Sequence, residues 1–172
     1  MPKKAVVIGP ESTGKTTLSI SLATHFQVPW VPEFARQYIG AMDGSYREPD
    51  LLEIARGQIK TEDQIALNAG SLLICDTDLY VIKVWSEHAF GSCDPWILEQ
   101  IAVRKYDLYL LTCIDLPWEP DPQREYPDRS MREYFYSVYR DIVINAGLPW
   151  ADIRGSREER IMRATGAVNL IL

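Results

Sequence analysis

The sequence has few cysteines, no excess of basic residues and no long apolar run, and each shortage excludes a class of protein. Its 24 acidic residues outnumber 18 lysines and arginines, giving a net charge of -6, which argues against nucleic-acid or membrane-surface binding through basic charge. No apolar run approaches the roughly 18 residues of a membrane helix, and the stretch before Gly9 is too short for a signal peptide. Three cysteines without paired metal spacing indicate reduced thiols in a cytoplasmic protein.

Short apolar segments alternate with segments of helical periodicity along the whole chain. Five strands that alternate with helices predict a mostly parallel sheet covered on both faces, so we expect an α/β three-layer sandwich. A length of 172 residues fits one domain, residues 1–172. Helix starts are predicted at Asp94-Pro95 and at two Ser-x-x-Glu capping boxes, Ser130 with Glu133 and Ser156 with Glu159. The predicted strands are residues 5–8, 28–31, 72–75, 108–113 and 150–153.

The strongest pattern is GPESTGKT at residues 9–16, which matches the phosphate-loop motif GxxxxGK[ST]. Its glycines let backbone N–H groups converge on phosphate oxygens, Lys15 would contact the β- and γ-phosphates, and Thr16 would bind Mg²⁺. Because the motif follows a predicted strand and opens a predicted helix, we expect it to bind ATP or GTP. The predicted nucleotide-binding residues are Gly9, Glu11, Ser12, Thr13, Gly14, Lys15, Thr16 and Thr17.

Two carboxylates follow the third predicted strand, at the sheet edge where ligands bind in α/β proteins. Asp76 ends the apolar run LLICD, and an aspartate in this position predicts a second ligand for Mg²⁺, beside Thr16. Asp78 either caps the next helix or binds hydroxyl groups of an acceptor substrate.

The other candidate catalytic residues lie after the second strand and in a proline-rich segment. Glu33 is the candidate base for an attacking hydroxyl, and Arg36 is a candidate substrate ligand. Prolines exclude a helix or central strand between residues 115 and 128, which favours either a surface loop or a lid, placed at about residues 115–132. Its Arg124, Arg129 and Arg132 suit a transferring phosphoryl group. We take Arg124 and Arg129 as catalytic candidates and expect at least one of the three to form a surface ion pair.

Motifs that are absent narrow the class of enzyme. The sequence contains neither the Asn-Lys-x-Asp of a GTPase nor the Leu-Ser-Gly-Gly of a transporter ATPase. A small-molecule kinase fits the acceptor-side carboxylate and the lid, whereas a regulatory ATPase that binds a protein partner remains an alternative. Gly155 and Arg157, in the turn after the last predicted strand, are candidates for contact with the nucleotide base.

Together, residues 9–16, the segment EFAR at 33–36, the segment CDTD at 75–78 and the predicted lid resemble the nicotinamide riboside kinase domain of bacterial NadR-type proteins. The resemblance covers essentially the whole chain. It implies a P-loop kinase fold with a five-stranded parallel sheet, ATP and Mg²⁺ as cofactors, and phosphorylation of the 5′-hydroxyl of nicotinamide riboside to nicotinamide mononucleotide. Another nucleoside or small metabolite is the alternative acceptor, because Pro32 stands where relatives can carry an aromatic residue. The helix-turn-helix and the His-x-Gly-His motif of longer members do not occur in this sequence, so repression and NAD synthesis are not implied.

Overall fold

The computed structural model describes residues 1–42 and 45–172. Within these residues, one parallel sheet contains five strands in the order β2-β3-β1-β4-β5, which confirms the predicted architecture. β2 begins two residues later than predicted and β4 ends one residue earlier. The strands are β1 (Lys3–Ile8), β2 (Trp30–Val31), β3 (Leu72–Asp76), β4 (Leu108–Thr112) and β5 (Trp150–Ile153).

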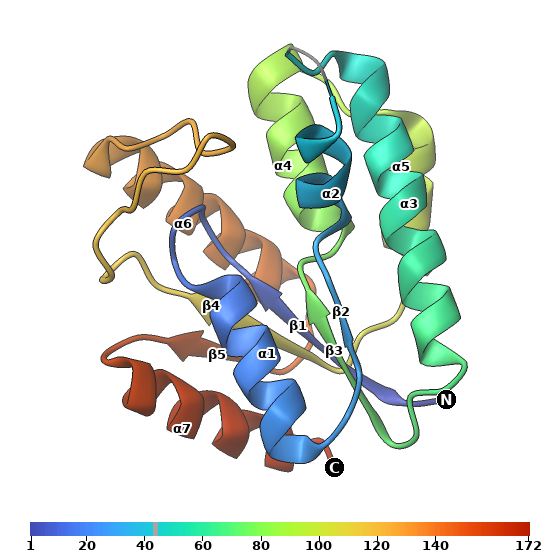
Figure 1. Cartoon of the computed structure of the whole chain (residues 1–172), viewed down its shortest axis with the longest axis vertical. Helices are drawn as coiled ribbons and strands as arrows, with labels where there is room; N and C mark the ends of the chain where they lie inside the picture. Colours follow the sequence, from blue (N-terminus) through green and yellow to red (C-terminus); the bar gives the residue numbers. More distant parts are fainter. Residues whose placement is uncertain (43–44) are drawn as a thin grey trace.

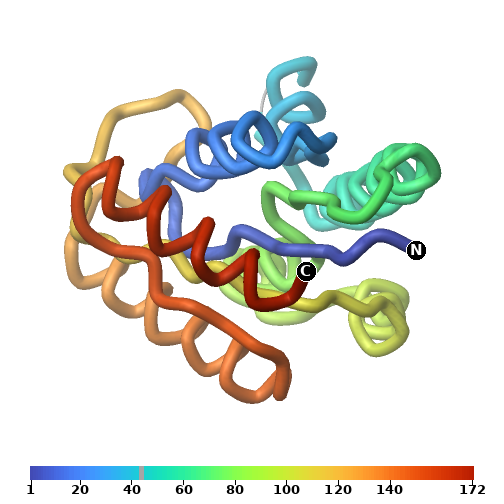
Figure 2. Tube along the Cα trace, turned by 90° about the horizontal axis from the view of Figure 1, so that it is seen from below, coloured from blue at the N-terminus to red at the C-terminus, as the bar shows by residue number. Residues whose placement is uncertain are grey.

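Helices cover both faces of the sheet and a further group of helices packs beside it. Figure 2 shows α1 on one side of the sheet and α6 on the other, and Figure 1 shows α3, α4 and α5 gathered on the side of the sheet that carries β2 and β3. The helices are α1 (Lys15–Phe26), α2 (Phe34–Gly40), α3 (Glu48–Ala66), α4 (Leu79–Phe90), α5 (Pro95–Val103), α6 (Arg129–Asn145) and α7 (Arg157–Asn169). In the described part of the chain, no helix is both long enough and apolar enough to cross a membrane.

The core follows from the two-residue period of the buried strands. In β1, Ala5 and Val7 pack against α1 and α7, while Val6 and Ile8 pack against the opposite layer, which includes α6. The neighbouring strands repeat this alternation. All four of these β1 side chains are buried, because helices on both faces exclude water from the central strands.

Two of the three predicted helix starts are confirmed and one is wrong. Asp94 caps α5, and Ser156 with Glu159 forms the predicted capping box at α7. The box predicted at Ser130 is not formed, because α6 begins two residues earlier than this box implies and Asp128 is its cap. The Asp128 carboxylate accepts hydrogen bonds from the backbone N–H groups of Ser130 and Met131, so the aspartate takes the position that the serine would have filled.

Candidate active site

The site lies at the carboxyl ends of β1 and β3, which are neighbours in the sheet. The strand register places Val7 beside Asp76, and the N–H of Thr77 donates to the carbonyl of Val7 over 3.1 Å. The chain leaves β1 at Gly9, where an added Cβ would lie 2.4 Å from the Thr112 hydroxyl. Only glycine fits this close approach, so the first glycine of the motif sets the path of the phosphate loop.

The phosphate loop is held in shape by its own side chains. The hydroxyl of Thr13 and the ammonium group of Lys15 both donate to the carbonyl of Pro10, each over 2.7 Å. Gly14 has a φ of +78° and is the N-cap of α1, so the positive end of this helix faces the loop. Burial lowers the pKa of Lys15, although the carboxylates of Glu33 and Asp76 oppose that shift.

Thr16 and Asp76 fit a Mg²⁺ ion. The Thr16 hydroxyl donates to Oδ2 of Asp76 over 2.6 Å, and Oδ1 of Asp76 is buried without a hydrogen-bond partner among the described residues. Burial raises the pKa of Asp76 to about 6, and the Glu33 carboxylate adds to this shift. An unpaired buried oxygen of this kind is satisfied by a cation. Thr16 and Asp76 would hold Mg²⁺ with phosphate and water oxygens completing the shell, and the bound ion would neutralise phosphate charge.

A cavity of about 640 Å³ opens above the loop, and every predicted nucleotide-binding residue from Gly9 to Thr17 lines it. Glu33 and Arg36 line the same cavity, as do Arg124 and the aromatic rings of Tyr46 and Trp85. The two rings meet edge to face, with their centroids 4.6 Å apart. The structure therefore brings the predicted phosphate-binding residues together with the predicted acceptor-side residues.

Helix α2 is fixed on α3 by two contacts that place Glu33 and Arg36. The N–H of Phe34 donates to the side chain of Gln58 over 2.8 Å, and the Phe34 ring occupies the space that a side chain at Gly57 would need. Glu33 is the N-cap of α2, and its carboxylate lies 3.7 Å from Nε of Arg36. This ion pair lies at the wall of the cavity, on the side where the sequence predicted residues that contact the acceptor.

The predicted lid lines this cavity with residues 121–126 and is hydrogen-bonded to the phosphate loop. The Glu11 carboxylate accepts hydrogen bonds from the indole N–H of Trp118 over 3.2 Å and from the backbone N–H groups of Glu125 and Tyr126 over 3.0 and 2.5 Å. The Ser12 hydroxyl accepts one more from the N–H of Glu119. The side chains of Glu11 and Ser12 thus connect the loop to the lid, while both residues also line the cavity, and their predicted contact with the nucleotide stays a prediction.

The lid also contacts the acceptor side of the cavity. Arg36 donates to the carboxylate of Asp121 over 3.1 Å, and the Gln123 side-chain amide donates to the Arg36 carbonyl. Residues 113–128 contain neither helix nor strand, as the prolines predicted.

The three lid arginines occupy different environments. Arg124 lines the cavity, and Arg132 is buried with a hydrogen bond to the Leu116 carbonyl and a long contact to that of Ser12. The side chain of Arg129 is 87% exposed and pairs with Glu133 on the surface of α6. Arg129 was a catalytic candidate, and its position does not support that role. It is the surface ion-pair member that the sequence also led us to expect.

Asp78 is not brought together with Glu33. The strand ends at Asp76, and Thr77 has a φ of +72°, which interrupts the two-residue alternation and turns Asp78 away. The buried Asp78 carboxylate caps α4 through the N–H of Tyr80 and accepts the hydroxyl of Tyr109 over 2.8 Å. It lines a separate groove of about 630 Å³. The predicted contact with substrate does not fit this position, and the alternative reading as a helix cap does.

Replacing Asp78 by alanine is therefore expected to lower stability rather than substrate affinity. The variant loses a helix cap, which costs about 1 kcal/mol, and leaves the buried Tyr109 hydroxyl without its acceptor, which costs about 1–3 kcal/mol. Urea unfolding should show the sum as a lower free energy of unfolding. Tyr109→Phe is the control, and the double variant should cost less than the two single changes together. An unchanged free energy of unfolding together with a raised KM for the acceptor would contradict this prediction and would assign Asp78 to substrate binding.

Among the described residues, 1–42 and 45–172, none from the turn between β5 and α7 lines the cavity. Gly155 has a φ of +98° and donates its N–H to the Asp115 carboxylate over 2.6 Å, and Arg157 is exposed at the start of α7. Their proposed contact with the nucleotide base stays a prediction.

Sequence reasoning missed three residues whose contacts form only in the folded chain, namely Gly57, Tyr46 and Arg160. Gly57 and Tyr46 are remote from every motif, and Arg160 is a charged residue on the helix face that also carries the buried Ala164 and Val168. A buried arginine at a helix start has no local signal, because its partners come from loops far apart in the sequence.

A family model described as an AAA domain matches residues 4–160. The chain belongs to this family. The match begins in β1 and runs through the phosphate loop, the acceptor-side segment and the lid to the first turn of α7. The motifs that define the candidate site therefore all lie inside the matched region.

The resemblance to NadR-type proteins is also confirmed. The chain is 23% identical over 173 residues to the trifunctional NAD biosynthesis/regulator protein NadR of Escherichia coli (strain K12), covering 98% of this chain and 42% of that protein. A crystal structure of NadR with NAD and AMP-PNP superimposes with a TM-score of 0.81, and one of NadR with NR with a TM-score of 0.78. Both are 23% identical to this chain, cover 99% of it, and are themselves covered to 49% and 51%. The chain thus spans about two fifths of the curated relative.

Proposed function

We propose that this protein transfers the γ-phosphoryl group of ATP to the 5′-hydroxyl of a nucleoside, with nicotinamide riboside as the acceptor. The observation that carries the proposal is the shared cavity of about 640 Å³, in which the phosphate loop faces Glu33 and Arg36. Group transfer requires donor and acceptor in one enclosure, because positioning and charge stabilisation supply most of the catalysis of phosphoryl transfer.

The walls of the cavity support a nucleoside as the acceptor. Tyr46 and Trp85 offer flat aromatic surfaces, and the carboxylates of Glu33, Asp121 and Glu125 line the same space. Nicotinamide riboside carries a positive charge on its pyridinium ring, which aromatic faces and carboxylates both attract. The NadR structure solved with NR has the same fold, which favours the same acceptor.

The proposal gives each residue a role. Lys15 bridges the β- and γ-phosphates, Glu33 orients the acceptor hydroxyl and accepts its proton, and Arg124 stabilises charge on the transferring group. Arg36 holds the acceptor while its guanidinium binds Asp121 of the lid over 3.1 Å.

The decisive experiment is ATP turnover with purified protein, Mg²⁺ and one nucleoside at a time, with chromatography of both products. The expected result is ADP formation that depends on nicotinamide riboside, with an equal amount of nicotinamide mononucleotide. ADP formed at the same rate without an acceptor would instead favour the regulatory ATPase. Equal or faster phosphorylation of adenosine, cytidine or thymidine would show that the acceptor is another nucleoside.

A further inference from the structure

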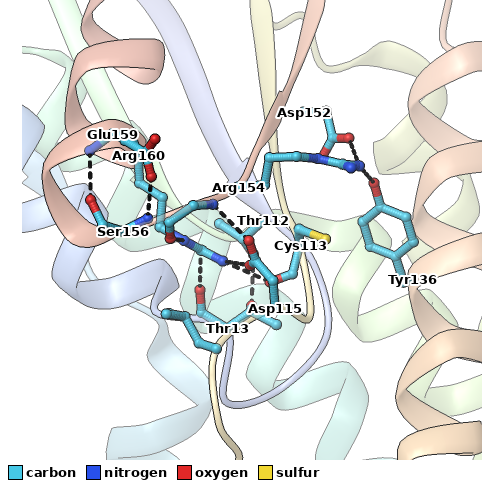
Figure 3. A network of polar contacts seen from close by, with 12 residues as sticks. Thr13, Thr112, Cys113, Asp115, Tyr136, Asp152, Arg154, Ser156, Glu159 and Arg160 are labelled. Carbon is cyan, nitrogen blue, oxygen red and sulfur yellow. Dashed lines mark hydrogen bonds and ion pairs between the residues drawn. The ribbon is translucent and has the colours of Figure 1, made fainter.

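Arg160, in the first turn of α7, is a buried arginine whose guanidinium joins three loops (Figure 3). Its side chain is only 5% exposed and is paired with the carboxylate of Asp115. Its remaining donors bind backbone carbonyls: Nε to Gly155 over 3.0 Å, Nη1 to Thr13 over 2.9 Å and Nη2 to Cys113 over 3.0 Å. These carbonyls belong to the β5–α7 turn, the phosphate loop and the segment that leads from β4 into the lid.

The chemistry of arginine explains why this residue can join the three loops. A guanidinium has five N–H donors in a rigid plane, whereas an ammonium group is a compact charge with three donors on a flexible stem. Burying the charge is costly unless it is paired and its donors are satisfied, and Asp115 with the three carbonyls meets both conditions. Arg160 therefore holds these carbonyls in fixed directions relative to one another.

The contact with Thr13 determines how the phosphate loop presents its donors. In a planar trans peptide the C=O and the following N–H point in opposite directions. Because Arg160 binds the Thr13 carbonyl, the N–H of Gly14 points away from Arg160, and a phosphate in the cavity that Gly14 lines would meet this donor. Gly14 adopts a left-handed φ of +78°, which glycine permits without steric cost, so the contact with Arg160 is what selects the direction of this peptide.

Asp115 extends the connection to the lid and to the turn before α7. One of its carboxylate oxygens pairs with Arg160, and the other accepts the N–H of Gly155 over 2.6 Å. Arg160 and Asp115 thus connect the first residues of the lid, the turn and the phosphate loop in one network of polar contacts. A change in any one of them would alter the direction of the Thr13 carbonyl.

We propose that Arg160 is a positioning residue for the nucleotide: it orients the Thr13–Gly14 peptide so that the Gly14 N–H is available to a phosphate oxygen. The inference rests on the proposed function only in that this loop binds ATP. It does not depend on which acceptor is phosphorylated.

The test is the affinity of Arg160→Lys for ATP and for inorganic tripolyphosphate, each measured by titration calorimetry. Lysine keeps the charge beside Asp115 but cannot bind all three carbonyls, so both ligands should bind about 10- to 100-fold more weakly. In the kinase assay, KM for ATP should rise while KM for the nucleoside stays the same. Arg163→Lys, an exposed position one turn further along α7, is the matched control and should bind ATP like the wild type.

Thermal unfolding and circular dichroism separate this role from a purely structural one. A variant that melts earlier but, when folded, binds both ligands like the wild type overturns the proposal. So does weaker ATP binding with unchanged tripolyphosphate binding, since that pattern places the effect at the base. If Arg160→Lys does not fold, Asp115→Asn replaces it, with a loss of ATP affinity expected and an unchanged affinity overturning the proposal. If the wild type binds ATP but phosphorylates no nucleoside, the proposed function is refuted. The comparison of ATP and tripolyphosphate binding between Arg160→Lys and the wild type still tests the role of Arg160.

Discussion

Lys15→Ala is expected to lower the rate of phosphoryl transfer by about three orders of magnitude, as for the loss of a main electrostatic stabiliser of a transition state. The ammonium group is the only lysine charge lining the described part of the cavity, and burial strengthens its interaction with phosphate charge. Backbone donors of the loop remain, so ATP affinity should fall less than kcat. Initial rates from a coupled ADP assay, with ATP affinity from calorimetry, measure the two effects separately.

Lys60→Ala is the matched control for Lys15→Ala. Lys60 is an exposed lysine on α3, so its loss should change neither kcat nor the affinity for ATP. Turnover of Lys15→Ala close to that of the wild type would mean that the phosphate-loop motif does not do the chemistry assigned to it.

Glu33→Gln is expected to lower kcat by about 10²- to 10⁴-fold with little change in KM. Glutamine keeps the shape of the side chain and one hydrogen bond to the acceptor hydroxyl, but it cannot accept a proton. Phosphoryl transfer has a loose transition state in which the base mainly orients the hydroxyl, and this places the effect in kcat. Saturation kinetics with both substrates give the two parameters.

Glu53→Gln is a close control, because Glu53 pairs with Arg56 three residues later on a helix just as Glu33 pairs with Arg36. The control changes a carboxylate in a similar ion pair that lies outside the cavity, so kcat and KM should both stay at wild-type values. A raised KM with an unchanged kcat in Glu33→Gln would assign Glu33 to acceptor binding, and the base would have to be sought elsewhere.

The phosphate loop and the strands could be predicted because their signals are local. An apolar run such as LLICD indicates a strand that is buried on both faces of the sheet. Residues 9–16 contain both the phosphate loop and the start of the helix that follows it. The position of Asp76 beside that loop follows from the pairing of β1 with β3. The alternation of strands and helices implies that both strands end at the same edge of the sheet, but it does not specify that they are neighbours.

The positions of other candidates depend on backbone angles and distant partners that the sequence does not display. Thr77 adopts a left-handed φ although it is not glycine, and this single residue separates Asp78 from the cavity. Arg129 and Arg132 have the same local composition around them, yet one faces solvent and the other is buried, because only the second faces the sheet side of α6. The four partners of Arg160 come from residues 13, 113, 115 and 155, which no local pattern connects.

The hydrogen bonds between Glu11 and the lid have a consequence for the apparent affinity of any nucleotide. Three lid donors bind this carboxylate, and at about 1 kcal/mol for each bond they favour a closed lid by at most about 3 kcal/mol, because ordering the lid costs entropy. At that upper limit an open form would make up roughly 1% of the free protein. A ligand that binds only the open form would then show a dissociation constant up to about 100-fold above its intrinsic value. A nucleotide that binds the closed form equally well does not lose this factor in affinity. The bonds of Glu11 therefore determine how strongly the site discriminates between ligands that fit beneath the lid and ligands that do not.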